Sequence, residues 1–274
     1  MNIFDSSFSL KDKKILVTGA SSGIGLEISN ELAKKGFNII LTARREEKLR
    51  DEAEKIQKKY NVVVDFIASD LSDINSPIEI FNYCENNNYQ VDILVNNAGY
   101  GIKTSFHETS MEDEERFIRV LGTSVIALSK AFLPKMMERN YGKIMIVSSV
   151  AAFAPPSAIQ ALYGPIKTFM NRFSDSLNIN YNDHGITSTS VCPGFTHTEF
   201  HTASGVQDEM DRVPGFLKFS AKQIAYEGVR ATLRGKRICV PTRTYKTLVF
   251  LLKLMPSWFI GLSGKILAPG RYDN

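Results

Sequence analysis

The chain has 274 residues, of which 43% are hydrophobic and 23% charged, a composition typical of a soluble globular protein and not of a disordered or collagen-like chain. Its net charge, 33 − 29 = +4, is too small to favour nucleic acid as a partner. Three cysteines without CxxC spacing predict a reducing compartment. The four histidines form no metal motif, and the N-terminal residues lack the pattern of a signal peptide. We therefore expect a cytoplasmic protein without a metal site.

Seven short runs of β-branched and apolar residues recur along the chain, with segments of helical periodicity between them. Such continuous runs are typical of parallel strands that are buried on both faces. They predict strands at Lys14–Thr18, Asn38–Thr42, Val62–Ala68, Val91–Val95, Lys143–Ser149, Ile186–Cys192 and Arg237–Val240. The alternation predicts an α/β fold, a Rossmann-type doubly wound sheet of seven parallel strands in a single domain. Ligands of such a sheet bind beyond the carboxyl ends of its strands.

The first predicted strand runs into a glycine-rich segment, Thr18–Gly25, which opens a helical pattern over Leu26–Lys35. Glycines at this junction let the backbone approach a pyrophosphate, and the free N–H groups of the helix bind its charge. The alternative is a tight turn that merely needs positive φ. The candidate phosphate contacts are Gly19, Ser21, Ser22, Gly23, Ile24 and Gly25.

Three further motifs follow in order. They are Asn96-Asn97-Ala98-Gly99 after the fourth strand, Tyr163-x-x-x-Lys167 in a later helix, and Pro193-Gly194 after the sixth strand. Together with the glycine segment, and over about residues 12–242, this set closely resembles the short-chain dehydrogenase/reductase family. The resemblance implies an oxidoreductase that uses a nicotinamide cofactor.

The end of the second strand indicates which cofactor is used. An NAD enzyme places a carboxylate here for the ribose 2′-hydroxyl, whereas this chain has Arg44 and Arg45. Two guanidinium groups suit a 2′-phosphate, so we expect NADP(H), with Arg44 as the main contact and Ser22 as a second one. The alternative is that both arginines are solvated and paired with Glu46 and Glu47.

The resemblance also implies that Asp70 contacts the adenine and that Asn96 holds the backbone on the cofactor side. The remaining cofactor contacts that it implies are Leu71, Asn97, Ala98, Gly99, Tyr163, Lys167, Pro193, Gly194, Thr196 and Thr198.

Tyr163 and Lys167 are four residues apart and so share one face of a helix. A neighbouring ammonium lowers the pKa of a phenol and makes it a better acid near neutral pH. As the family implies, Tyr163 would protonate a carbonyl oxygen and Lys167 would also hold the ribose. The family's third catalytic residue is a serine, 13 residues before the tyrosine. That position is Val150, so we assign Ser149, although Ser148 and Ser149 could simply end a strand.

A second departure lies in the preceding long helix. Many family members have an asparagine 13 residues before a proline, here Pro134, and that asparagine is thought to bind a water molecule that links the lysine to solvent. The position is Leu121, which offers no hydrogen bond. Either the proton relay is rerouted, or turnover is impaired, or Leu121 has joined the core.

The family's substrate lid falls at about residues 195–220 and is rich in apolar side chains. They are Phe200, Met210, Val213, Phe216, Leu217 and Phe219. Because ligand pockets are mainly apolar, these residues predict a lipophilic substrate, unless they only pack the lid onto the body. Ala151, Ala152, Phe153 and Tyr100 would extend the same wall. His197 and His201 are expected to be exposed loop residues.

The chain thus divides into a catalytic domain, residues 1–242, and a basic, apolar C-terminal extension, residues 243–274. Residues 235–274 carry seven Lys or Arg and one acidic residue. The extension is too interrupted to span a membrane. It could cover a subunit interface or the substrate pocket, or it could make a peripheral membrane contact.

We therefore expect an NADPH-dependent reductase that converts a 3-oxoacyl, steroid-like or long-chain ketone or aldehyde into an alcohol. The alternative is a catalytically weak NADP(H)-binding sensor or scaffold. The resemblance also implies a homodimer or homotetramer, for which the helix over Ala161–Tyr181 could supply the interface.

Overall fold

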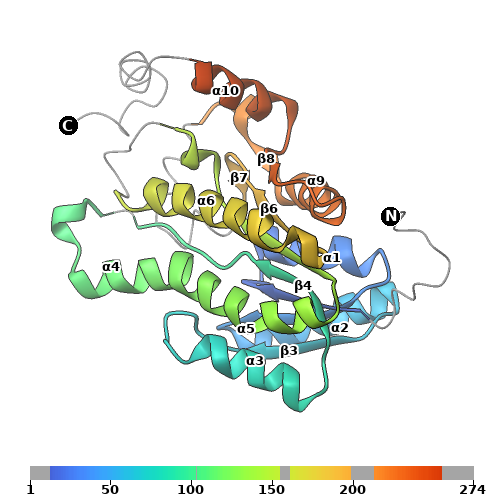
Figure 1. The fold of residues 1–274 in the computed structure, drawn as a ribbon. Coiled ribbons are helices and arrows are strands. Elements are labelled where there is room, and N and C mark those ends of the chain that lie inside the picture. The colour runs from blue at the N-terminus through green and yellow to red at the C-terminus, as the bar shows by residue number, and fades with distance from the viewer. Residues whose placement is uncertain (1–12, 103, 155–160, 199–212, 255–274) are drawn as a thin grey trace.

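A parallel sheet of seven strands forms the centre of the molecule (Figure 1). The computed structural model describes residues 13–102, 104–154, 161–198 and 213–254. The strands are β1 (Lys14–Thr18), β2 (Asn38–Ala43), β3 (Val64–Ala68), β4 (Val91–Asn96), β5 (Gly142–Val147), β6 (Ile186–Val191) and β9 (Ile238–Cys239). Their order across the sheet is β3-β2-β1-β4-β5-β6-β9, and every neighbouring pair is parallel. The prediction of a single-domain α/β fold with a doubly wound, seven-stranded parallel sheet is confirmed.

Helices cover both faces of this sheet. On one face lie α1 (Gly23–Ala33), α2 (Glu46–Tyr60) and α9 (Ala221–Leu233). On the other face lie α3 (Ser76–Asn86), α4 (Met111–Ile118), α5 (Ser124–Glu138) and α6 (Tyr163–Tyr181). A last helix, α10 (Arg243–Leu254), lies beyond α9 in the chain and near the carboxyl ends of the strands.

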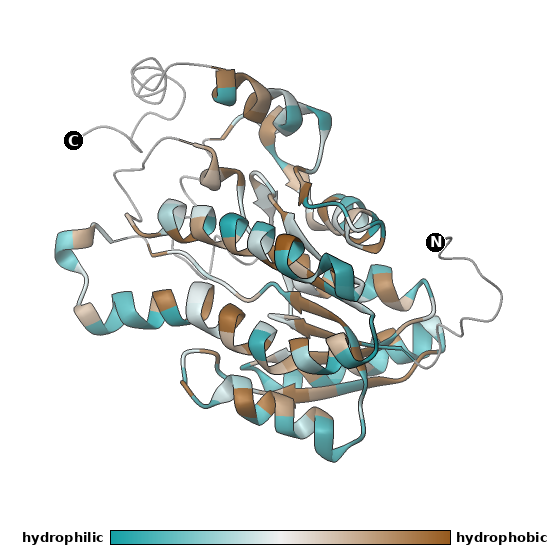
Figure 2. Cartoon of the chain, in the orientation of Figure 1, coloured by the Kyte–Doolittle hydropathy of each residue, from teal (hydrophilic) through white to brown (hydrophobic). Residues whose placement is uncertain are grey.

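Two separate apolar cores result from the alternation of side chains along each strand. Ile15 and Val17 of β1 pack in the core under α1 and α9, whereas Leu16 packs in the core under α3, α5 and α6. Figure 2 shows the central strands in brown and the helices with mixed brown and teal. This pattern explains why the strands read as continuous apolar runs, since both faces of the sheet are covered.

Serine hydroxyls and charged side chains fix the ends of several helices. Ser110 caps α4 by accepting a hydrogen bond from the Asp113 amide, and Ser220 caps α9 in the same way through the Gln223 amide. The helix α2 begins with two glutamates, ends with two lysines, and stops at Asn61, whose φ is +55°. Acidic residues at the start and basic residues at the end interact favourably with the helix dipole and so stabilise α2.

Some predicted strand ends are displaced from their observed positions. β3 begins at Val64 and not at residue 62, and β5 ends at Val147 and not at residue 149. The two serines after β5 leave the strand because Ser149 begins a short 3-10 helix, η4 (Val150–Ala152), by accepting a hydrogen bond from the Ala151 amide.

Two features were not expected from the sequence. A small parallel sheet joins β7 (Thr196–His197) to β8 (Phe219–Ser220). Between α4 and α5 the helix widens into a π turn, η3 (Arg119–Thr123), which contains Leu121. Residues 155–160, 199–212 and 255–274 lie outside the described residues, and with them Phe200, His201 and Met210 of the expected lid and most of the C-terminal extension.

The continuous helical stretch Met111–Glu138 is long and apolar enough to cross a membrane by length and composition. However, 56% of its most apolar window is buried inside the fold, and Leu128 and Phe132 belong to the core beneath the sheet. It therefore has the properties of a core helix.

Candidate active site at the carboxyl edge of the sheet

The segment between β1 and α1 turns sharply on glycines. Gly19 and Gly23 have φ of +64° and +59°, a region that side chains rarely adopt. A Cβ atom on Gly19 would lie 2.8 Å from the Cα atom of Ala98, and one on Gly25 would lie 2.4 Å from Nδ2 of Asn97. The glycines therefore serve both the turn and the close approach of the segment that follows β4.

Asn97 fastens this turn to β4. Its side-chain amide donates to the backbone oxygens of Thr18 and Gly19, at 2.9 and 3.2 Å. The backbone amides of Asn97 and Ala98 in turn donate to the Thr18 hydroxyl. The expectation that Asn96 holds this backbone was wrong, because the Asn96 side chain is buried next to Ser129, toward α5.

The first turn of α1 begins without a side-chain cap. Ser22 occupies the N-cap position in an extended conformation, but its side chain makes no capping hydrogen bond. The serines before α4 and α9 do make that bond. An uncapped helix start at a glycine turn is a ready site for a phosphate group.

Arg45 reaches back from β2 to this turn. Its guanidinium donates to the hydroxyls of Ser21 and Ser22 at 3.2 and 3.4 Å. Arg44 is also exposed at the end of β2. Sequence reasoning gave Arg44 the main role and missed the bond from Arg45 to the serines, which depends on how the two loops meet.

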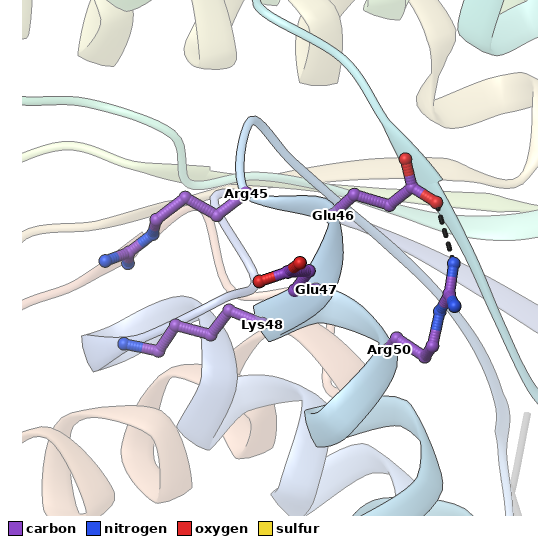
Figure 3. A pocket seen from close by; sticks show the side chains of 5 residues that line it. All are labelled: Arg45, Glu46, Glu47, Lys48 and Arg50. Atoms are coloured by element: carbon purple, nitrogen blue, oxygen red, sulfur yellow. Dashed lines mark hydrogen bonds and ion pairs between the residues drawn. The ribbon is translucent and has the colours of Figure 1, made fainter.

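A hollow of about 650 Å³ lies at the start of α2 and is lined by Arg45, Glu46, Glu47, Lys48 and Arg50. Figure 3 shows Arg45 and Lys48 pointing to one side of the helix start. Glu46 and Arg50 lie on the other side, joined by an ion pair at 2.9 Å (Figure 3). Arg50 thus provides a partner for Glu46, one of the two acids that could have paired with the arginines, and the hollow offers positive charge next to the glycine turn.

Asp70 and Leu71 follow β3 on the neighbouring edge. Asp70 is exposed, and its carboxylate accepts a hydrogen bond from the Ser72 amide at 3.0 Å. Leu71 is buried in the core. The structure therefore places Asp70, Arg44 and the glycine turn at the carboxyl ends of β3, β2 and β1, which are adjacent strands.

Tyr163 and Lys167 lie one turn apart at the start of α6. The Lys167 ammonium lies 5.5 Å from the centroid of the Tyr163 ring and donates to the backbone oxygen of Val147 at 2.9 Å. Only 6% of Lys167 is exposed, and burial lowers its pKa from 10.5 to about 8. A positive charge at neutral pH is therefore held close to the phenol.

The two serines after β5 have different surroundings. Ser148 is buried, and its hydroxyl donates to the backbone oxygen of Lys167 at 3.0 Å. Ser149 caps η4, and η4 in turn packs against the start of α6. Ser148 thus positions the helix that carries the lysine, whereas the Ser149 hydroxyl holds the start of η4.

A buried thiol lies close to Ser148 and Lys167. Cys192 lies at the end of β6, and its thiol donates to Oδ1 of Asn171 at 3.5 Å. Burial raises its pKa to about 12, so it stays protonated and is no nucleophile. The following Pro193 accepts a hydrogen bond from the Val150 amide, which joins the segments after β5 and β6.

Aromatic rings form a wall beside Tyr163. The rings of Phe117 and Tyr163 are 6.5 Å apart between centroids, and Phe117 makes an edge-to-face contact with Tyr100 at 5.4 Å. Leu121 is buried in the same core, close to Gly99. Burial supports the interpretation that Leu121 has joined the core.

The segment after β6 closes over the glycine turn. A Cβ atom on Gly23 would lie 3.1 Å from Cβ of Thr198, and the buried Thr196 donates its hydroxyl to the backbone oxygen of Gly194 at 2.9 Å. Together, the turn, the α1 start and the nearby guanidinium groups offer a site for the phosphates of a dinucleotide. Among the described residues no group of three or more metal-ligating side chains occurs.

Comparisons with known proteins agree with this geometry. The short chain dehydrogenase family matches residues 13–209. An uncharacterized oxidoreductase of Staphylococcus saprophyticus is 31% identical over 189 residues, which are 69% of this chain and 80% of the relative. The very-long-chain 3-oxoacyl-CoA reductase-B of Danio rerio is 31% identical over 229 residues, 81% of this chain and 71% of the relative.

Solved structures share the fold. A short-chain dehydrogenase from Sphingobium yanoikuyae, in complex with NADPH, superposes with a TM-score of 0.79 at 23% identity, over 96% of this chain and 97% of that one. The L-sorbose reductase of Gluconobacter frateurii, complexed with NADPH and L-sorbose, gives 0.74 at 24% identity, over 84% and 94%. At these identities the likeness is one of fold.

Proposed function

Because this chain belongs to the short chain dehydrogenase family of oxidoreductases, we propose that it reduces a ketone or aldehyde on a lipophilic substrate to an alcohol with NADPH. The observation that carries the proposal is the Tyr163–Lys167 pair, whose buried ammonium lies 5.5 Å from the phenol ring. Two structural neighbours hold NADPH, and one relative is a 3-oxoacyl-CoA reductase, which supports this reaction class.

The proposed chemistry divides between cofactor and protein. The bound cofactor supplies a hydride to the carbonyl carbon. Tyr163 donates its hydroxyl proton to the carbonyl oxygen, so that the product is a neutral alcohol. Lys167 stabilises the resulting phenolate by its charge, and the Ser149 hydroxyl holds the substrate oxygen in place. Val147 and Ser148 hold the lysine and its helix in position.

The proposed substrate is lipophilic because aromatic side chains flank the pair. Tyr100 packs on Phe117, a core residue next to Tyr163, and Phe153 follows η4. Phe216 is 71% exposed near the chain segment that returns from the lid. Such a wall favours 3-oxoacyl, steroid-like or long-chain carbonyl compounds over sugars.

Replacement of Tyr163 by phenylalanine tests the reaction. We expect Tyr163→Phe to lower kcat about 10²–10⁴-fold, measured as NADPH consumption at 340 nm on a panel of carbonyl compounds, with NADPH binding retained. Tyr181→Phe, at the other end of the same helix, should leave kcat unchanged. Tight NADPH binding by the wild-type protein without turnover on any compound would instead support a cofactor sensor or scaffold.

Replacement of each arginine tests the cofactor. We expect Arg45→Ala and Arg44→Ala each to weaken NADPH binding about tenfold and NADH binding hardly at all, since charge-assisted bonds to a phosphate are lost. Arg50→Ala, whose partner is Glu46, is the matched control. Equal weakening of both cofactors would refute the 2′-phosphate site.

We also propose a cytoplasmic protein that touches a membrane surface through α10. Phe250, Leu251 and Leu254 are exposed on this helix, and Arg243 and Lys253 supply positive charge for anionic lipids. Phe250→Ser with Leu254→Ser should abolish co-sedimentation with phosphatidylserine vesicles. Ile74→Ser, an equally exposed residue elsewhere, should not.

The proposed oligomer is a homodimer or homotetramer that uses α6. Phe169 and Ile179 are large apolar side chains exposed on this helix, and a second copy of the chain would cover them. Light scattering after gel filtration should give a multimer for the wild-type protein and a monomer for Phe169→Asp.

A further inference from the structure

The helix α10 is tied to the site by one tyrosine. Tyr245 is 4% exposed. Its hydroxyl donates to the backbone oxygen of Leu217 at 2.9 Å and accepts from the backbone amide of Phe195 at 3.0 Å. Phe195 precedes β7, and Leu217 ends the short helix η6 (Gly215–Leu217) just before β8. A single hydroxyl thus joins the start and the end of the region, about residues 195–220, in which the lid is expected.

The ring of Tyr245 occupies the space that a side chain at position 194 would need. A Cβ atom on Gly194 would lie 1.9 Å from Cζ of Tyr245, and Phe219 packs edge-to-face on the same ring at 5.8 Å. Gly194 is therefore required by the tyrosine that sits on it. This contact gives the glycine of the Pro193-Gly194 motif a partner that lies 51 positions later in the chain.

The start of α10 is held in a strained conformation. Thr242 has φ of +69°, which is rare for a β-branched residue. Its amide donates to the Glu227 carboxylate of α9, and its hydroxyl accepts from the Tyr245 amide. Lys246 pairs with the same Glu227 at 3.1 Å. Surrounding contacts that hold such strain often mark a functional position.

The far end of α10 contacts the other side of the site. The Lys253 ammonium lies 5.1 Å from the ring centroid of Phe153, directly after η4 and Ser149. The helix therefore contacts the segment after β6 through Tyr245 and the segment after β5 through Lys253. Both segments carry residues of the proposed active site.

We propose that Tyr245 is a positioning residue that closes the segment Phe195–Thr198 and residues 213–220 over the site, so that α10 sets how tightly cofactor and substrate are held. The proposal rests on the proposed reductase function. Phe195 is three residues before Thr198, which packs on Gly23 of the glycine turn. Loss of the hydroxyl frees the Phe195 amide and the Leu217 carbonyl, and the closed arrangement loses two hydrogen bonds.

The test compares Tyr245→Phe, which keeps the ring, with Tyr226→Phe, an exposed tyrosine of α9. We expect Tyr245→Phe to raise KM for the carbonyl substrate and Kd for NADPH roughly 5–30-fold. The change in kcat should be smaller than that in KM, and Tm should stay within a few degrees of wild type. Amide hydrogen exchange at Phe195 should become faster. Tyr226→Phe should match wild type in every measurement.

A second variant tests the packing of the Tyr245 ring on Gly194, in case the ring matters more than its hydroxyl. Gly194→Ala should displace the Tyr245 ring and reproduce the KM and Kd changes. Tyr245→Ala added to it should cause little further loss, because the displaced ring has already lost its contacts. Wild-type KM, Kd and exchange in Tyr245→Phe would overturn the proposal, as would a lower Tm with unchanged KM. Exchange at Phe195 and NADPH binding need no turnover, so they test Tyr245 even if no carbonyl compound is reduced.

Discussion

Lys167 combines two properties that rarely coexist in one side chain. It is almost fully buried, yet its ammonium must stay charged to act on Tyr163. Burial lowers its pKa to about 8, so the group is charged below pH 8 and neutral above it. Because the pKa in the unfolded chain is higher, the unfolded state binds more protons between about pH 8 and 10.5, and stability rises with pH across that window.

This titration predicts an alkaline limit for carbonyl reduction. We expect kcat/KM, which reports the free enzyme, to fall about tenfold per pH unit above pH 8, because the neutral amine no longer stabilises the phenolate. Lys167→Arg keeps its charge and should move this limit beyond the measurable range, even with a lower maximal rate. An unchanged limit in Lys167→Arg would assign it to another group.

Leu121 stands where the family resemblance implies an asparagine, and the structure shows how the helix accommodates the leucine. It lies in the π turn η3, is 2% exposed and packs in the same core as Phe117. A π turn within a helix is frequently found at functional sites. Here it brings an apolar side chain, in place of the family asparagine, against the segment that contains Gly99.

Replacement of Leu121 by asparagine separates a role of this residue in packing from a role in proton transfer. We expect Leu121→Asn to destabilise the protein by about 2–4 kcal/mol, since a polar amide enters an apolar core, and to leave kcat unchanged. Urea unfolding and steady-state kinetics measure the two effects. Leu121→Met, which keeps the volume, should cost less than about 1.5 kcal/mol. A higher kcat in Leu121→Asn would show that the leucine limits proton transfer.

On the scale of the whole molecule, a cluster of charged side chains lies at the amino edge of the sheet, at the opposite end of the strands from the candidate site. Asp92 of β4 is 1% exposed and pairs with Lys13 at 3.7 Å and Arg139 at 3.9 Å. The Arg139 side chain also donates to the backbone oxygen of Val91. Burial lowers the pKa of Lys13, and Asp92 partly offsets this change. The cluster joins the entry to β1, the start of β4 and the end of α5.

Removal of its one carboxylate should therefore be costly. We expect Asp92→Asn to lower the free energy of unfolding by about 3–5 kcal/mol, because the partly buried Lys13 and Arg139 lose the carboxylate with which they pair. Glu112→Gln removes an exposed partner of Arg116 and should cost less than about 1 kcal/mol. Denaturant titration of both variants measures these changes in the free energy of unfolding. Similar small decreases in the two variants would mean that the buried cluster contributes little to stability.

The fold and much of the site could be predicted because their signals are local in the sequence. Continuous apolar runs identified all seven strands of the main sheet, and the glycine segment identified the turn before α1. Three features depend on how distant segments meet. They are the bond from Arg45 to the serines, the bonds by which Asn97 and not Asn96 holds the glycine turn, and the contact of Tyr245 with Gly194. The π turn and the two-residue strands β7 and β8 are too short for a periodic pattern to reveal.

The packing of α1 against α9 has a consequence for synthesis on the ribosome. Ile28 and Leu32 of α1 lie in a core that Ile224, Ala225 and Val229 of α9 complete. A nascent chain can cover α1 early with β1, β2 and α2, but it lacks the α9 side of this core until almost two hundred further residues have emerged, so the core is completed only late in synthesis.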